Sequence, residues 1–128
     1  MSYYLARTLP IAFDEAIDRV SAALKREGFG VLTDIDVKAT LKTKLGVDTP
    51  RYRILGACNP GFAHQALQLE NKLGVLLPCN VIVREESPQQ TEIATIDPVA
   101  SMERTGNPEL AAVAGEVRTR LQRAIEEL

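Results

Sequence analysis

Hydrophobic and polar positions follow two different periods along this chain, and the changes of period divide it into short elements. Runs of alternating character, rich in β-branched and aromatic residues, predict strands. The predicted strands cover residues 3–9, 29–35, 52–57, 81–85 and 92–96. Apolar residues that recur at spacings of three and four predict amphipathic helices between the strands. The predicted helices cover residues 13–27, 37–45, 60–73, 98–105 and 108–128.

Capping residues and helix breakers mark the ends of these elements. The glycine stops are Gly28, Gly46, Gly74 and Gly106, and the helix starts are Asp36 and the pairs Asn59-Pro60, Asp97-Pro98 and Asn107-Pro108. Proline suits the first helical position because the N–H that it lacks would have no partner within the helix. Residues 87–90 predict a turn, so the last two strands are expected to pair as an antiparallel hairpin.

The order of the elements defines the expected fold class. It reads β-α-β-α-β-α-β-β-α, and no linker, repeat or low-complexity tract interrupts it. We therefore expect an α+β fold, a single compact domain over residues 1–128 with a mostly antiparallel sheet packed against helices. Alternation in the second strand puts Phe29, Val31, Thr33 and Ile35 on one face. The stripe in the last helix that is expected to pack on the sheet contains Leu110, Val113, Val117, Leu121, Ala124 and Leu128.

Composition and charge narrow the class of partner. The 128 residues are 45% hydrophobic and 25% charged, which is enough apolar surface for one core without help from a cofactor. The net charge of -2 argues against nucleic acid, whose binding usually rests on a surplus of Lys and Arg. No apolar stretch approaches the ~20 residues that would span a bilayer, and the N-terminal segment lacks the pattern of a signal peptide. We expect a cytoplasmic protein with no membrane partner.

The candidate functional residues lie at two predicted turns, and in each turn an apolar run is followed by a Cys-Asn pair. Cys58 and Asn59 end one predicted strand, and Cys79 and Asn80 precede another. Cys58 lies just before a helix start, where the helix dipole and unpaired backbone N–H groups can lower a thiol pKa. His64, the only histidine, falls in the first turns of that helix. The two cysteines are too few to form a disulfide framework, so we expect reduced thiols.

Several roles remain open for these residues. Cys58, Cys79 and His64 could supply three metal ligands, although their spacing matches no compact zinc motif. Cys58 could instead attack a substrate as a thiolate with Cys79 as the resolving thiol, or both could be inert and buried. Asp97 lies at an element end, where aspartate more often caps a helix than transfers protons. Nucleotide-binding, metalloprotease and serine-hydrolase motifs are absent from the sequence.

The same turns carry a family resemblance. Residues 55–60 (LGACNP), residues 76–81 (LLPCNV) and the Asp97-Pro98 pair are similar to the DUF 302 family, a domain of unknown function. Residues 27–31 and 34–37 fit the family too, so the resemblance covers nearly the whole chain. It implies a compact α+β domain of bacteria and archaea that forms a homodimer, but it implies no reaction. It also marks the Cys58 and Cys79 turns and Asp97 as signature positions.

Our leading hypothesis is a dimeric protein that binds a small molecule or a metal ion near the Cys58 and Cys79 turns. The expected ligand-binding residues are Cys58, Asn59, His64, Cys79, Asn80 and Asp97. In this hypothesis the helix N-terminus after Asn59 offers backbone donors and Phe62 closes an apolar wall. The alternatives are a thiol-based redox enzyme or sensor, and a homodimer with a purely structural or partner-binding role. No cofactor is indicated, and the sequence does not decide whether the protein is an enzyme.

Overall fold

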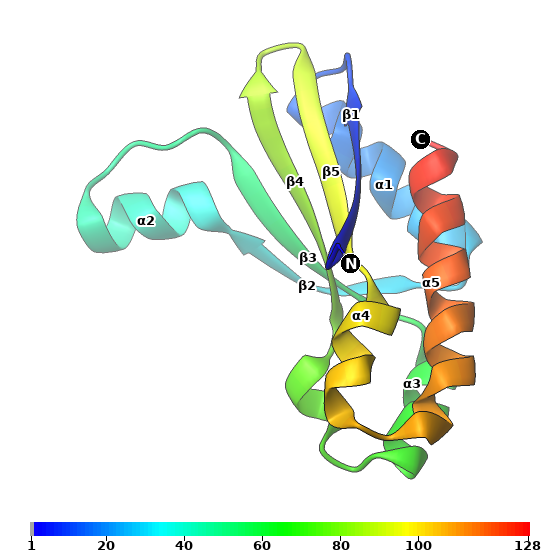
Figure 1. The fold of residues 1–128 in the computed structure, drawn as a ribbon. Helices are drawn as coiled ribbons and strands as arrows, with labels where there is room; N and C mark the ends of the chain where they lie inside the picture. Colours follow the sequence, from blue (N-terminus) through cyan, green and yellow to red (C-terminus); the bar gives the residue numbers. More distant parts are fainter. Residues whose placement is uncertain (1) are drawn as a thin grey trace.

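The computed structural model describes residues 2–128 and contains one five-stranded antiparallel sheet with the strand order β1-β5-β4-β3-β2 (Figure 1). The strands are β1 (Tyr4–Leu9), β2 (Gly30–Asp36), β3 (Tyr52–Cys58), β4 (Cys79–Ser87) and β5 (Gln90–Ile96). The α-helices are α1 (Phe13–Arg26), α2 (Val37–Leu45), α3 (Pro60–Leu69), α4 (Pro98–Met102) and α5 (Ala111–Glu126). Three short 3₁₀ turns are η1 (Leu73–Leu76), η2 (Glu103–Thr105) and η3 (Pro108–Leu110). The predicted α+β fold and the hairpin of β4 and β5 are confirmed.

The core lies between one face of the sheet and the helices α1 and α5 (Figure 1). In β4, Val81 and Val83 are fully buried while Ile82 between them is only partly buried, as expected when alternate side chains point to opposite faces. Val20 of α1 and Leu121 of α5 are fully buried within the same core. The apolar stripe expected in the last helix therefore packs on the sheet as predicted.

The opposite face of the sheet carries a shallow hollow of about 400 Å³. Its apolar lining includes Tyr4 of β1, Tyr52 of β3, Ile82 of β4 and Ala94 of β5. Tyr4 is 46% exposed, so part of this face presents aromatic and aliphatic surface to solvent. The two faces of the sheet thus differ, because two helices cover one and an exposed apolar hollow marks the other.

Strand β2 and helix α2 form an arm that projects from the body of the domain (Figure 1). Every residue of β2 is exposed and no residue of α2 is buried. The ends of α2 follow the sequence prediction, since Asp36 Oδ1 accepts a hydrogen bond from Ala39 N at 2.9 Å and Gly46 ends the helix with φ +69°. The ends of α2 are thus set by local contacts, and the arm is joined to the domain through the pairing of β2 with β3 while α2 buries none of its residues.

A bulge in β2 changes the predicted alternation of its side chains. Val31 pairs with Ala57 of β3, whereas Thr33 pairs with Gly56, the residue before Ala57. Because consecutive strand residues point to opposite faces, Val31 and Thr33 lie on different faces, and Ile35 shares the face of Thr33. The predicted common face for all three residues is therefore wrong, and the extra residue at the bulge is the reason.

The third helix also ends earlier than the pattern predicts. Helix α3 ends at Leu69 rather than continuing to residue 73, and Gly74 lies within η1 instead of terminating α3. Asn107 from a distant turn donates through Nδ2 to the carbonyl oxygen of Leu69 at 2.9 Å, so a tertiary contact satisfies this helix end. Leu73 then enters the core from η1 and is 1% exposed. The spacing of Leu73 from the preceding apolar residues predicted its burial correctly. The prediction that the helix continues to Leu73 is wrong.

The last two predicted helices both include 3₁₀ segments. Helix α4 ends at Met102 and η2 continues to Thr105, before Gly106 with φ +69°. The final helical segment starts with η3 after Asn107, whose side chain accepts a hydrogen bond from Glu109 N, and becomes α-helical at Ala111. Within residues 2–128, no helix is long and apolar enough to cross a membrane.

Candidate functional site

An apolar cavity of about 360 Å³ lies at the end of the sheet where β3 finishes and β4 begins. One wall is formed by Ala57 and Cys58 of β3 and by Cys79 of β4. Helix α3 contributes Phe62 and Ala63 to the cavity lining. Further lining residues are Phe29, Leu32, Ala66, Leu67, Leu77, Pro78, Met102, Val113 and Val117. The volume falls in the range of about 300–1,000 Å³ found for small-molecule pockets.

The cavity exists because small side chains face it from closely packed elements. Ala57, Ala63 and Ala66 line it where larger residues would fill the space. Gly56 allows β2 and the loop before β4 to approach β3, since a Cβ at this position would overlap Thr33 Oγ1 and lie 2.7 Å from Pro78 Cγ. Thr33 and Pro78 both line the cavity. The glycine therefore brings two walls together, and the alanines leave room between them.

The two cysteines lie on neighbouring strands at the cavity wall. Cys58 is half-buried at the end of β3, and Cys79, which pairs across the ladder with Ala57, is 7% exposed at the start of β4. Both are free thiols. Burial, with a smaller contribution from the charge of nearby Cys58, raises the pKa of Cys79 to about 11. Cys79 is thus protonated near neutral pH, which favours a role as an apolar wall residue over one as a nucleophile.

Asn59 and Arg120 form a polar rim beside this cavity. Asn59 lines the cavity and holds the N-cap position of α3, but its side chain makes no capping hydrogen bond. Its Nδ2 instead donates to the carbonyl oxygen of Glu27 at 3.5 Å, and Arg120 Nη1 donates to the same oxygen at 3.4 Å. The Arg120 guanidinium carbon lies 5.1 Å from the centre of the Phe62 ring. Two side-chain donors therefore converge at the edge of an otherwise apolar space.

Three of the expected site residues lie away from the cavity lining. Asn80 is exposed and borders the hollow on the open face of the sheet, and His64 is exposed on α3. Asp97 is 5% exposed, accepts hydrogen bonds from Val99 N and Ala100 N at the start of α4, and pairs with Arg118 at 3.0 Å. These contacts give Asp97 a capping role. The structure thus brings together Cys58, Asn59 and Cys79 from the expected set.

The described residues do not assemble the expected metal site. No group of three or more His, Cys, Asp or Glu side chains in residues 2–128 is arranged to hold a metal ion. The hypothesis that Cys58, Cys79 and His64 act together as ligands therefore finds no support in the geometry. Soft thiol ligands without further donors also leave a divalent ion incompletely coordinated.

Several cavity residues could not be recognised as site residues in the sequence. Val113 and Val117 belong to the stripe that predicted core packing, and they do pack there, but they also line the cavity. Leu32 reaches the lining from the bulged part of β2. Arg120 gives no signal in the sequence beyond its place on an amphipathic helix. Phe62 was predicted as a wall residue because it is an apolar neighbour of the helix start at Asn59, and it does line the cavity.

This fold and cavity define a small α+β domain with an apolar site at one end of its sheet. Over residues 5–128 the chain matches the family described as Domain of unknown function DUF302, and it belongs to that family. It is also similar to the crystal structure of the uncharacterized conserved protein DUF302 from Bacillus stearothermophilus, with 29% sequence identity and a TM-score of 0.91. That similarity covers 99% of this chain and 98% of the other. None of the curated proteins compared with the chain matches it.

Proposed function

We propose that this protein binds an apolar small molecule in the cavity at the junction of β3, β4 and α3. The observation that carries the proposal is a space of about 360 Å³ lined by alanine, valine, leucine and phenylalanine side chains. Part of this lining is exposed to solvent, including Leu32 and Leu67, so an apolar ligand that covers it is favoured because it removes apolar surface from water. The few polar groups at its edge, including Asn59, can orient such a ligand.

The thiols fit this function as part of the wall. We infer a cytoplasmic location, where cysteines remain reduced and behave as small, polarisable apolar residues. The raised pKa of Cys79 supports this role, because its neutral form adds no charge to the cavity. The rival redox function needs Cys79 to attack a modified Cys58 as a thiolate, and that step is disfavoured near neutral pH.

The binding of a neutral apolar dye tests the proposal. The probe is 1-aminoanthracene, whose fluorescence rises in an apolar site. Ala63 lines the cavity, so Ala63→Trp should fill part of it and weaken dye binding by about tenfold or more. Ala112 is exposed on α5 and outside the cavity lining, so Ala112→Trp is the matched control.

Circular dichroism establishes that both variants are folded before the comparison. Dye binding by the wild-type protein that Ala63→Trp weakens and Ala112→Trp retains would support the cavity as the site. No dye binding by the wild-type protein, or equal binding by all three folded proteins, would overturn the proposal.

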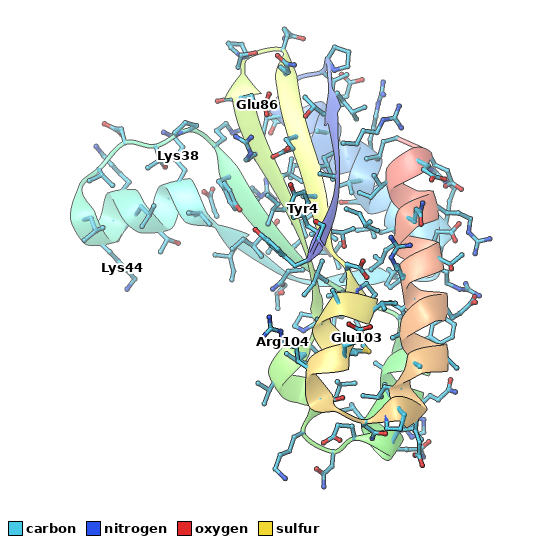
Figure 2. All side chains as sticks on the ribbon, in the orientation of Figure 1. Tyr4, Lys38, Lys44, Glu86, Glu103 and Arg104 are labelled. Atoms are coloured by element: carbon cyan, nitrogen blue, oxygen red, sulfur yellow. The ribbon has the colours of Figure 1, made fainter. Side chains whose placement is uncertain are left out.

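We also propose that two copies of the chain associate through the open sheet face and the β2–α2 arm. Helix α2 is nine residues long with no buried residue, and so short a helix gains most of its stability from packing. Figure 2 shows Lys38 and Lys44 on this arm and Tyr4 and Glu86 on the sheet. Within residues 2–128, Lys44 of α2 pairs with no carboxylate, and Glu86 and Glu92 at the β4–β5 end share one arginine, Arg84. A twofold arrangement can therefore place the Lys44 end of each arm near the acidic end of the other sheet.

Sedimentation equilibrium tests the association and its location. Tyr4→Glu introduces a charge on the open face, where Tyr4 is 46% exposed, and should shift a wild-type dimer towards monomer. Val75→Glu is the control, because Val75 is 87% exposed on η1 and lies outside this face. A monomeric wild-type protein would exclude the dimer, and equal dissociation by both variants would exclude this interface.

A further inference from the structure

The rim of the cavity carries a pair of hydrogen-bond donors that the apolar lining does not explain. Asn59 Nδ2 and Arg120 Nη1 point at the same acceptor, the carbonyl oxygen of Glu27. Their distances of 3.5 Å and 3.4 Å are long compared with the usual value of about 2.9–3.0 Å, so both bonds are weak. One carbonyl oxygen thus holds two donor side chains loosely beside the cavity.

The position over Gly28 shows that the two donors are close neighbours. A Cβ added to Gly28 would lie 3.0 Å from Asn59 Nδ2 and 3.9 Å from Arg120 Nη1. Asn59 itself lines the cavity, and Arg120 stacks over Phe62, which lines it too. The donors therefore come from the β3–α3 junction and from α5 and meet at the carbonyl oxygen of Glu27, beside the part of the wall that Asn59 and Phe62 form.

Both side chains retain donor capacity for a ligand. Arg120 Nε donates to Glu116 Oε1 at 3.2 Å and one Nη1 hydrogen is directed at Glu27 O, so among the contacts within residues 2–128 three of its five N–H groups remain available. The Arg120 side chain is 34% exposed and the Glu116 carboxylate is more open, at 47%. An exposed helix pair of this kind contributes little stability, and it competes weakly with a ligand oxygen at the rim.

We propose that the ligand is an amphipathic carboxylate whose apolar chain fills the cavity and whose carboxylate binds Arg120 and Asn59. This inference rests on the proposed function and adds the chemical class of the ligand. A planar guanidinium can bind both oxygens of a carboxylate, and charge-assisted hydrogen bonds are stronger than neutral ones. The carbonyl oxygen of Glu27 positions the donors and carries no charge, Glu116 is the carboxylate that pairs with Arg120, and the guanidinium carbon lies 5.1 Å from the centre of the Phe62 ring.

Isothermal titration calorimetry with a matched pair of probes tests this class. Decanoate and 1-decanol have the same chain length and differ in the head group, so the ratio of their affinities isolates the carboxylate. We expect the wild-type protein to bind decanoate about tenfold more tightly than 1-decanol above the pKa of the acid. Arg120→Gln should bring this ratio close to one.

Arg123→Gln provides the control on the same helix. Arg123 pairs with the side chain of Glu27 at 3.0 Å and is 51% exposed, but unlike Arg120 it makes no contact within residues 2–128 with the Phe62 ring or with the carbonyl oxygen of Glu27. The variant removes the same charge from the same region and should keep the preference for decanoate. A ratio that falls equally in both variants would show a general effect of charge and would overturn the role of Arg120.

The two probes separate failure of this inference from failure of the proposed function. If the wild-type protein binds 1-decanol and decanoate equally, the cavity is a binding site and the carboxylate class is wrong. If it binds neither probe, nor the neutral dye, the binding function itself is wrong. Retention of the full decanoate preference by folded Arg120→Gln would also overturn the inference.

Discussion

At the scale of single residues, the shape of the site depends on Gly56, because its neighbours leave no space for a side chain. Gly56 lies where Thr33 and Pro78 meet over β3, and a Cβ there would overlap Thr33 Oγ1 and approach Pro78 Cγ to 2.7 Å. Real Cβ contacts are essentially never this short, so the neighbours must move if a methyl group is added. Both neighbours line the cavity, so a larger side chain at Gly56 would change the shape of the site.

We therefore expect Gly56→Ala to lower the free energy of unfolding by about 1–3 kcal/mol, as overpacking of a close contact usually does. The matched control is Gly30→Ala on β2, because a Cβ at Gly30 meets no atom within 4 Å. Urea unfolding followed by circular dichroism measures both changes. An equal loss in the two variants would indicate a general effect of replacing glycine in a strand.

The buried thiol makes a second prediction at this scale. With its pKa raised to about 11 by burial, Cys79 is a thiolate in about one molecule per thousand at about pH 8. Iodoacetamide should therefore modify Cys79 slowly in the native protein and at an ordinary rate in denaturing urea. Mass spectrometry of peptides after timed quenching distinguishes it from half-buried Cys58. Equal rates for Cys79 in native and unfolded protein would contradict the assigned burial.

At the scale of elements, the edge strand β2 is held to β3 by an ion pair as well as by the ladder. Arg53 Nε donates to Asp34 Oδ1 at 3.0 Å, and a second bond joins Arg53 Nη2 to Asp34 Oδ2. The hydrogen bond from Arg53 lowers the pKa of Asp34 below its usual value of 3.8, against the smaller opposing effect of burial. Because every residue of β2 is exposed, such side-chain contacts matter more there than apolar packing.

The sign of the pH dependence follows from the lowered pKa. The ionised Asp34 stabilises the fold above the unfolded pKa of 3.8, and this contribution is lost as the pH falls through the lower, folded pKa. Asp34→Asn should therefore cost at most about 1 kcal/mol near pH 7, after allowance for solvent exposure, and progressively less as the solution is acidified below 3.8.

Unfolding titrations over this pH range measure the difference, and exposed Asp18→Asn on α1 is the control. A cost for Asp34→Asn that stays constant into strong acid would show that the carboxylate charge is not its source. A similar pH-dependent cost in Asp18→Asn would show a general charge effect.

At the scale of the whole molecule, the cavity joins elements that are distant along the chain. Its walls come from β3 and β4, from α3, and from Val113 and Val117 of α5. A ligand that binds only the assembled walls must stabilise the native fold, because unfolding separates them.

We expect decanoate at a free concentration of 100 times its dissociation constant to add about 2.7 kcal/mol to the stability, and to raise the melting temperature by on the order of 10 °C. Thermal unfolding followed by circular dichroism measures this shift. Ala63→Trp should show little shift at the same ligand concentration, because its cavity is filled. An equal shift in both proteins would place the stabilising site elsewhere.

The sequence by itself determined the fold class, most of the elements and part of the candidate site. Neighbouring residues are sufficient to predict these features, because the spacing of apolar residues indicates the buried face of an element and the capping residues indicate where a helix begins and ends. Asp36 and Gly46 do bound α2, and Asp97 caps α4. The Cys-Asn turn at Cys58 does open onto a cavity that also includes Cys79.

Only the tertiary structure decided which of the expected site residues meet. The end of α3 at Leu69 has its carbonyl oxygen bound by Asn107, 38 residues away, and the bulge in β2 is defined by its pairing with β3. Asn80 points to the open face because side chains alternate along β4, while Cys79 before it lines the cavity. Arg120 reaches the carbonyl oxygen of Glu27, which Asn59 also contacts, only through the packing of α5. Such contacts join distant parts of the chain, and no local period encodes them.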